Sequence, residues 1–224
     1  MTAAARPGSA GGGGRGPERL AIFGATGGIG GHLLSWAVDA GYPVHALARN
    51  PAAVPRRPGI TVTGGDATDP AAVADAVASA DAVLSALGPR GAKTPGLLAA
   101  AADTVTQAMA KSGVRRLICV SAAGAFIRED PAANPLVKMI LPSIFAKPFA
   151  DAREMERVVR ASTLDWTLVR PARLVNAPGT GQYRIRDRYP PPGLTKIARA
   201  DVAQFMITAL TTGGYLHQAP ALCW

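Results

Sequence analysis

The residues best suited to chemistry form a glycine-rich segment near the N-terminus, Gly24-Ala-Thr-Gly-Gly-Ile-Gly30. It follows a short apolar run and precedes a helical pattern, which is the setting in which such a segment binds a nucleotide. One glycine permits a tight turn, another lets the backbone approach a pyrophosphate, and a third allows the helix to pack closely on the strand. The helix N-terminus then offers free N–H groups to the phosphates. The predicted cofactor contacts in this turn are Gly24, Thr26, Gly27, Gly28 and Ile29.

The residue after the second apolar run indicates which dinucleotide binds. An acidic residue there would accept a hydrogen bond from the ribose 2′-hydroxyl of NAD. This chain has Arg49 instead, and a guanidinium pairs bidentately with a 2′-phosphate. We therefore expect NADPH/NADP+ to be favoured over NAD, with Arg56 or Arg57 as a second contact. The alternative is that Arg49 is a solvated loop arginine.

The elements that must position these residues alternate along the chain. Apolar runs predict strands at 20–23, 44–48, 60–63, 81–86, 117–120 and 166–169, and a short final strand within 215–223. Helical periodicity and start signals predict helices at 28–41, 69–79, 94–112, 149–162 and 201–211. Uniformly apolar strands in alternation with helices predict a doubly wound α/β fold, a parallel sheet covered on both faces. Such a sheet binds its ligand at the carboxyl ends of the strands.

Three segments of the chain fall outside this alternation of strands and helices. Residues 1–18 are rich in glycine and lack anchoring apolar side chains, which predicts a flexible tail before a single domain at 19–224. The segments 122–148 and 171–195 are predicted to be irregular because both are interrupted by prolines. They are the expected substrate loops, and the second belongs to a small C-terminal substrate-binding region.

The glycine-rich segment and several later ones, in the same order, resemble the atypical short-chain dehydrogenase/reductase superfamily. The similarity is to its NAD(P)-binding, NmrA-like branch, related to biliverdin reductase B, the NADPH-dependent flavin reductase. It covers nearly everything from residue 19 onward and implies a Rossmann-type fold. The later segments are Leu47-Ala-Arg-Asn50, Gly65-Asp-Ala67, Asp81-Ala-Val-Leu84, Ala86-Leu-Gly88, Val120-Ser-Ala122, Leu164-Asp-Trp-Thr-Leu-Val-Arg-Pro171 and Arg199-Ala-Asp-Val-Ala203.

The resemblance also implies roles for residues after the third, fourth and sixth strands. Asp66 should accept from the adenine amino group, and Ala67 should touch the ring. Leu87 and Gly88 should line the ribose and pyrophosphate. Arg90 is similar to an arginine near the cofactor phosphates, with a plain surface arginine as the alternative. Pro171, at the start of the second substrate loop, is also expected among the cofactor-binding residues.

Ser121 is the candidate catalytic residue that the resemblance implies, because the family places a serine beside the nicotinamide. Its hydroxyl is expected to donate to a substrate carbonyl or to orient the carboxamide; the alternative is a strand-end serine bonded to backbone. The family's Tyr, with a Lys four residues later, is absent, and Pro148 and Ala152 stand about where they would lie. No histidine occurs in 122–195 either. An acceptor that takes its proton from water, such as a flavin or quinone, suits such a site better than an ordinary carbonyl.

Substrate contacts are expected from the two loops. Phe126 and Phe145, with Ile140, Leu141 and Ile144, are predicted to form an apolar lid, although simple core packing is an alternative. The resemblance places Arg173 near the nicotinamide end, where it would pair with a polar or anionic acceptor. Tyr183 is expected to border the same pocket. The substrate residues named are therefore Arg173, Phe126, Phe145 and Tyr183.

Composition excludes several other classes of protein. The 224 residues are 48% hydrophobic, which excludes a disordered chain, and the net charge of +9 comes from arginines spread along the sequence, which argues against nucleic-acid binding. Two cysteines and three distant histidines provide neither a disulfide framework nor a metal site. The chain lacks an apolar run of about 18 residues and a secretory signal, so we expect no membrane contact and a cytoplasmic location. The expected partner is a small-molecule substrate, bound by a monomer or homodimer.

Three functions remain open at this point. The first is an NADPH-dependent reductase of a small conjugated acceptor: a flavin, a quinone or an enone of secondary metabolism. The second is a non-catalytic, NmrA-like nucleotide sensor, which the missing Tyr and Lys favour. The third is a tailoring enzyme that uses the same fold for cyclisation, isomerisation or dehydration without net redox.

Overall fold

The computed structural model describes residues 19–88, 96–191 and 196–224. Three predictions fall outside these ranges: the tail at 1–18, the position of Arg90, and the helix start at 94–95.

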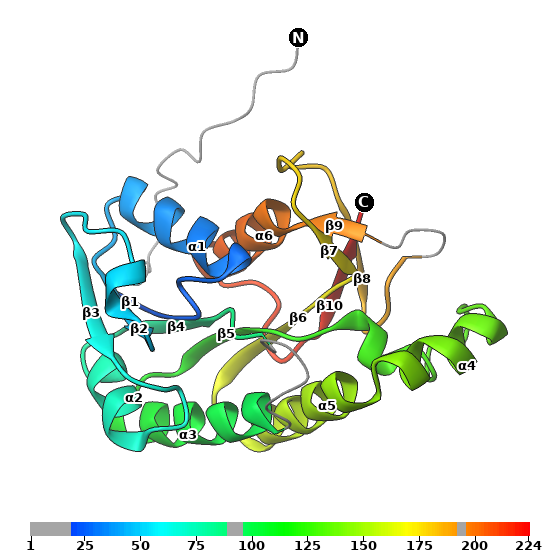
Figure 1. The fold of residues 1–224 in the computed structure, drawn as a ribbon, viewed down its shortest axis with the longest axis horizontal. Coiled ribbons are helices and arrows are strands. Elements are labelled where there is room, and N and C mark those ends of the chain that lie inside the picture. Colours follow the sequence, from blue (N-terminus) through cyan, green and yellow to red (C-terminus); the bar gives the residue numbers. More distant parts are fainter. Residues whose placement is uncertain (1–18, 89–95, 192–195) are drawn as a thin grey trace, which may run out of the picture.

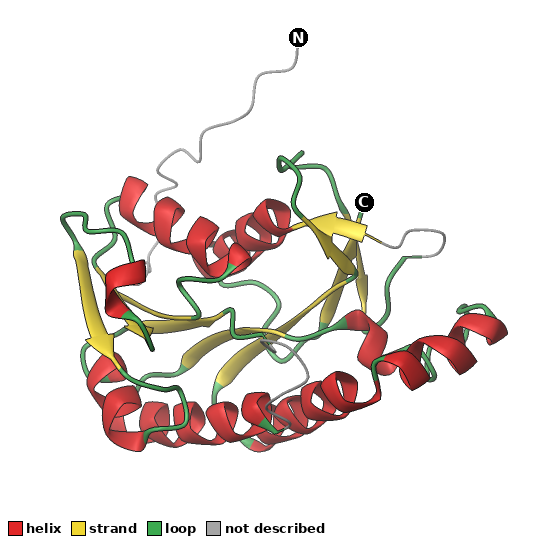
Figure 2. Ribbon diagram, in the orientation of Figure 1, coloured by secondary structure: helices red, strands yellow, loops and turns green. Residues whose placement is uncertain are grey.

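A mostly parallel sheet forms the centre of the described chain, as Figures 1 and 2 show. Its strands, in spatial order, are β3 (Ile60–Gly64), β2 (Val44–Ala48), β1 (Leu20–Phe23), β4 (Ala82–Ser85), β5 (Arg116–Val120), β6 (Asp165–Pro171), β10 (Pro220–Cys223) and β8 (Arg184–Asp187). Neighbouring strands are parallel except at one edge, where β8 pairs antiparallel with β10. The predicted α/β fold is confirmed.

Helices cover both faces of this sheet (Figure 1). On one face, α1 (Gly28–Asp39) packs against α6 (Arg199–Thr211). The other face carries α2 (Pro70–Val77), α3 (Leu97–Ser112) and α5 (Ala146–Ala161), with α3 between the other two. Each face buries its own apolar cluster, because strand residues alternate between the two sides. None of the helices in the described ranges has the length and apolar character needed to cross a bilayer.

The predicted start of α2 is confirmed. Asp69 is the N-cap: its Oδ1 accepts the N–H of Ala71 at 2.9 Å, and Pro70 occupies the first helical position. The helix that follows carries Val73 and Val77 on its buried face, as the periodicity predicts.

The segment 122–148 is largely helical, so the prediction of an irregular loop was wrong. It contains a 3₁₀ turn, η2 (Ala123–Phe126), the helix α4 (Pro135–Ile144) and the start of α5. Two prolines stand at helix starts rather than at breaks. Asn134 caps α4 by accepting the N–H of Leu136, and Pro135 takes the first position, where the missing N–H has no intrahelical partner to lose. Pro148 lies in the first turn of α5 for the same reason.

The C-terminal segment also has more structure than predicted. The described part of 171–195 contains β7 (Arg173–Val175) as well as β8, and β7 pairs in parallel with β9 (Lys196–Ala198) in a separate small sheet. The strand predicted within 215–223 is present as β10, beside β6. β9 contacts β10 of the main sheet and leads directly into α6.

Candidate functional site

A cavity of about 970 Å³ opens at the carboxyl ends of β1, β2, β4 and β5. Here the strand order reverses, since β2 lies on one side of β1 and β4 on the other. Parallel sheets bind ligands at this kind of position, and the volume is at the upper end of the usual range for small-molecule and cofactor sites. Among the predicted site residues, the cavity is lined by Gly24, Thr26, Gly27, Gly28, Ile29, Arg49, Asp66, Ala67, Leu87, Gly88, Ser121 and Phe145.

The glycine-rich turn connects β1 to α1. Gly24 has a φ of +81°, a left-handed conformation that glycine adopts without strain, and its carbonyl accepts the N–H of Gly27 at 2.9 Å. A Cβ at Gly30 would collide with that carbonyl oxygen. A Cβ at Gly27 would lie 3.2 Å from the same oxygen and would have no other neighbour within 4 Å. Gly30 therefore allows α1 to pack on the turn, while Gly27 leaves open space at the cavity.

The start of α1 is suited to an anion. Gly27 is the N-cap, no side chain caps the helix, and the first turn contains no acidic residue. The first N–H groups of a helix lack intrahelical partners, and they carry the positive end of the helix dipole. Here they belong to Gly28 and Ile29, which line the cavity. The uncapped turn and the open surface at Gly27 fit a dinucleotide pyrophosphate.

Arg49 and Asp66 lie together where β2 and β3 end. The Asp66 carboxylate accepts the hydroxyl of Thr68 at 2.8 Å and its N–H at 3.0 Å. These two bonds lower the pKa of Asp66, and the nearby charge of Arg49 lowers it slightly further. Asp66 is thus held as a hydrogen-bond acceptor, the form needed to receive an adenine amino group.

The second arginine contact predicted near Arg49 is not brought to the cavity. Arg56 and Arg57 line a separate hollow around the segment 50–58. Arg57 is also paired with Asp39 at 2.6 Å. Arg49 is therefore the arginine that the structure places at this end of the cavity.

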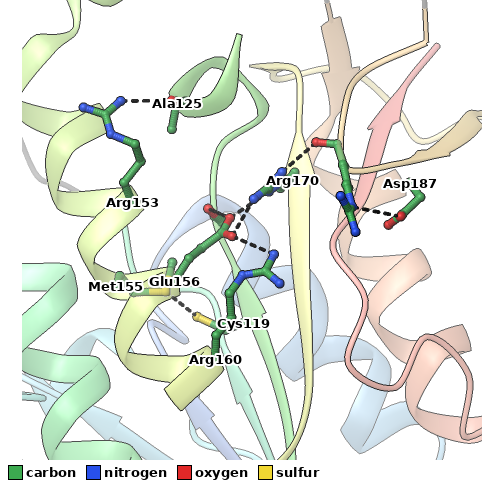
Figure 3. A network of polar contacts seen from close by, with 10 residues as sticks. Cys119, Ala125, Arg153, Met155, Glu156, Arg160, Arg170 and Asp187 are labelled. Atoms are coloured by element: carbon green, nitrogen blue, oxygen red, sulfur yellow. Dashed lines mark hydrogen bonds and ion pairs between the residues drawn. The ribbon is translucent and has the colours of Figure 1, made fainter. Parts of the chain in front are cut away.

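Ser121, directly after β5, is bonded to a buried polar network around Glu156, Arg160 and Arg170, which Figure 3 shows. Its hydroxyl donates to Glu156 Oε1 at 2.7 Å. Arg170 holds both oxygens of the same carboxylate, with Nε 2.8 Å from Oε1 and Nη2 2.6 Å from Oε2. Arg160 adds a bond of 3.2 Å to Oε2. Glu156 is 1% exposed and Arg170 is 4% exposed, so this ion pair is buried beneath the cavity floor at Ser121.

The network changes the expected role of Ser121. One of its two predicted roles has the hydroxyl donating to a substrate carbonyl, whereas the hydroxyl proton is directed at Glu156. The other role, orienting the carboxamide, stays a prediction. A carboxylate held by two guanidinium groups acts as an acceptor, so this orientation is fixed. Toward the cavity Ser121 presents lone pairs, which suits an N–H or O–H group of the ligand, such as the amide of a carboxamide.

Four other predicted residues do not line the cavity. Phe126 packs against Arg170, whose guanidinium carbon lies 3.4 Å from the ring centroid. Tyr183 packs edge-on against Phe205, and burial raises its pKa to about 12. Pro171 is buried in β6, and Arg173 is exposed on β7. These positions depend on packing between distant elements, which the loop sequences do not reveal.

Several cavity residues were missed from the sequence. The missed residues form an apolar wall from the start of α3, the first turns of α5, and β7: Leu97, Leu98, Pro148, Phe149, Ala152 and Leu174. Ile144, at the end of α4, belongs to the same wall and was predicted as part of the lid. Lys147 and Arg199 add charge to the lining. Ile140 and Leu141 of the predicted lid are not part of it. Glu156 had a usable signal, because it follows Ala152 and Met155 at the helical spacing of the buried face of α5.

Comparison with known proteins assigns the family. A model of the NAD(P)H-binding family matches residues 24–213. Because this match covers most of the chain, the protein belongs to that NAD(P)H-binding family. The expected resemblance to NAD(P)-binding reductases is confirmed by this match and by relatives named reductases, and a structure named a short-chain dehydrogenase/reductase from Veillonella parvula has the same fold, with a TM-score of 0.78.

Individual relatives include both redox and non-redox enzymes by name. A (4-alkanoyl-5-oxo-2,5-dihydrofuran-3-yl)methyl phosphate reductase of Streptomyces griseus is 30% identical over 210 residues, 91% of this chain and 67% of the relative. YhfK of Bacillus subtilis, named an uncharacterized sugar epimerase, is 30% identical over 204 residues, 86% of this chain and 87% of its own. The structure of ChuY, an anaerobilin reductase of Escherichia coli O157:H7, has a TM-score of 0.77 and 26% identity, covering 92% of this chain and 96% of that one.

Proposed function

We propose that this protein is an NADPH-dependent reductase that transfers hydride to a small conjugated acceptor, such as a flavin, a quinone or an enone. One observation carries the proposal. A single cavity contains the glycine-rich turn and Arg49, Ser121, and an apolar wall that suits a flat, hydrophobic molecule. The Streptomyces griseus reductase and ChuY, both named reductases, support the same class of reaction.

Each part of the chain would then have a defined task. The reduced nicotinamide supplies the hydride when the cofactor is bound. The uncapped start of α1 receives the pyrophosphate, and Arg49 receives the 2′-phosphate. Ser121 accepts a hydrogen bond from the carboxamide or from the acceptor. The apolar wall beside it excludes water and holds the acceptor against the cofactor.

The ionisable residues of the cavity limit how the acceptor is protonated. Within the described ranges, the lining contains no Tyr, His or Cys, and its ionisable members are Arg49, Asp66, Lys147 and Arg199. Asp66 lies at the adenosine end, and Ser121 has its proton directed at Glu156. Flavins and quinones form anions that water can protonate, so they need no dedicated acid. This favours them over simple ketones.

The test is NADPH oxidation against a panel of flavins, quinones and enones. Steady turnover with one class of acceptor supports the proposal and identifies the substrate class. NADPH binding with no turnover contradicts it and favours the NmrA-like sensor. Conversion of a sugar or enone without net NADPH oxidation favours the non-redox alternative. The similarity to YhfK, named a sugar epimerase, is the observation that supports this alternative.

Cofactor preference is tested by the substitution Arg49→Asp. The substitution exchanges attraction for repulsion at the 2′-phosphate, so NADPH affinity should fall at least about 10-fold, the scale of one lost charge-assisted hydrogen bond. NADH affinity should change much less. Calorimetric titration of both cofactors measures the effect, with Arg56→Asp as a matched control because Arg56 lies in the separate hollow. Equal losses for NADPH and NADH would show that Arg49 does not select the cofactor.

The proton supply is tested at Ser121. Ser121→Ala should lower turnover about 10-fold, the scale of one lost neutral hydrogen bond, because Ser121 positions the ligand rather than protonating it. Tyr183→Phe should change turnover little, since that ring packs on Phe205 away from the cavity. Steady-state kinetics with the best acceptor measures both. A collapse of about 10³-fold or more in Tyr183→Phe or in Lys147→Met would assign the acid to that side chain instead.

A further inference from the structure

Arg199, the first residue of α6, reaches across the glycine-rich turn that begins α1. It lines the same cavity as the turn. Its aliphatic chain lies directly over Gly28, where an added Cβ would collide with Arg199 Cδ and would lie 2.9 Å from Nε. A side chain at Gly28 would have to share this space with that of Arg199. The Arg199 side chain, up to Nε, therefore lies at the first residue of α1, a helix whose N-terminus has no side-chain cap.

The Arg199 guanidinium has a neutral hydrogen-bond partner. Its Nη1 donates to Asn176 Oδ1 at 2.7 Å, which is a neutral amide. Within the parts of the chain that the structure describes, Arg199 forms no ion pair with a carboxylate. The positive end of α1 thus lies beside a guanidinium that has no carboxylate partner in the described ranges, an arrangement that an anion bound between them would stabilise.

Two sets of hydrogen bonds restrict the position of the Arg199 side chain. Asp201, two residues further along α6, is 1% exposed and accepts the N–H of Gly181 at 2.9 Å and the indole N–H of Trp224 at 2.6 Å. These bonds fix the first turn of α6 against the C-terminal segment. Asn176 then fixes the direction of the guanidinium itself. A preorganised arginine loses little freedom when it binds a phosphate.

We infer that Arg199 is a pyrophosphate ligand that closes over the glycine-rich turn, and that Asn176 positions it. The inference rests on the proposed binding of NADPH in this cavity. The planar guanidinium matches the paired oxygens of a diphosphate, while the α1 N–H groups bind from the other side. Arg199 would therefore contribute equally to NADPH and NADH, which share the pyrophosphate. Arg49, in contrast, would contribute only to NADPH.

The experiment measures dissociation constants for NADPH and NADH by calorimetry in three variants. Arg199→Met keeps most of the chain that covers Gly28 and should weaken both cofactors by a similar factor of about 10 or more. Arg199→Lys should bind both cofactors more tightly than Arg199→Met, because lysine keeps the positive charge but lacks the paired N–H donors of a guanidinium. Asn176→Asp places a carboxylate beside the Arg199 guanidinium. Because this carboxylate competes with the pyrophosphate for Arg199, it should also weaken the binding of both cofactors. Arg157→Met, on the outer surface of α5, is the matched control.

The outcomes separate this inference from the proposed function. Similar losses for both cofactors, with unchanged unfolding temperatures of the free variants, support a pyrophosphate contact. Unchanged affinity in Arg199→Met overturns the inference while the binding of NADPH by the wild type still stands. A loss confined to NADPH also overturns it, because Arg199 would then contact the 2′-phosphate. A wild-type protein that binds neither cofactor contradicts the proposed function itself.

Discussion

A Gly27→Val protein is expected to fold normally and to lose dinucleotide binding, with affinity lower by about 100-fold or more, because a branched side chain fills the space that the pyrophosphate must enter. The backbone at Gly27 is extended, with φ −85° and ψ 169°, which valine adopts readily. An added Cβ there meets only the Gly24 carbonyl oxygen, at 3.2 Å, so a small shift accommodates it. Its methyl groups then project into the cavity.

The measurements are a calorimetric titration with NADPH and a thermal unfolding curve without ligand. Gly31→Val is the matched control, because a Cβ at Gly31 makes only an ordinary contact of 3.8 Å and the residue is not part of the cavity lining. This control should bind NADPH like the wild type. A Gly27→Val protein with wild-type affinity would refute the assignment of the turn as the phosphate site.

The second large effect is expected on stability. Glu156→Gln removes the charge that balances Arg170, and breaking a buried ion pair by removing one partner costs about 3–5 kcal/mol. Arg170 is only 4% exposed, so water cannot compensate for the loss. For a chain of this size the melting temperature should fall by on the order of 10 °C. Thermal unfolding followed by circular dichroism measures the change.

Two further variants make this prediction specific. Glu154→Gln, two residues earlier on α5, breaks an exposed ion pair with Arg157 and should leave the melting temperature almost unchanged. The double substitution Glu156→Leu with Arg170→Met removes both charges and should recover most of the loss, because apolar pairs of similar volume often replace buried ion pairs without penalty. Equal effects of Glu154→Gln and Glu156→Gln would show that the buried pair has no special role in stability.

The sequence determined the features that depend on local pattern. The parallel sheet was predicted from the apolar strands, the helix caps such as Asp69-Pro70 and the alternation of strands and helices. These features can be recognised from residues that are close together in the sequence. The glycine-rich turn and Arg49 were also predicted, since a residue that directly follows a parallel strand lies at the ligand edge of the sheet. The prediction of an irregular loop at 122–148 was wrong, because Pro135 and Pro148 were interpreted as helix breaks although both lie at helix starts.

Only the tertiary structure decided which side chains meet. Ser121 follows β5, Glu156 lies on α5 and Arg170 on β6. Helical spacing places Glu156 rather than Glu154 on the buried face of α5, but nothing in the sequence pairs that glutamate with Arg170. Likewise Arg199 reaches Gly28, while Phe126 and Tyr183 point into packed surroundings instead of the cavity. The reason is physical. Local propensity fixes where an element begins and which face is apolar, but the partner of a buried charge depends on how distant elements pack, and the cost of leaving that charge unpaired enforces the choice.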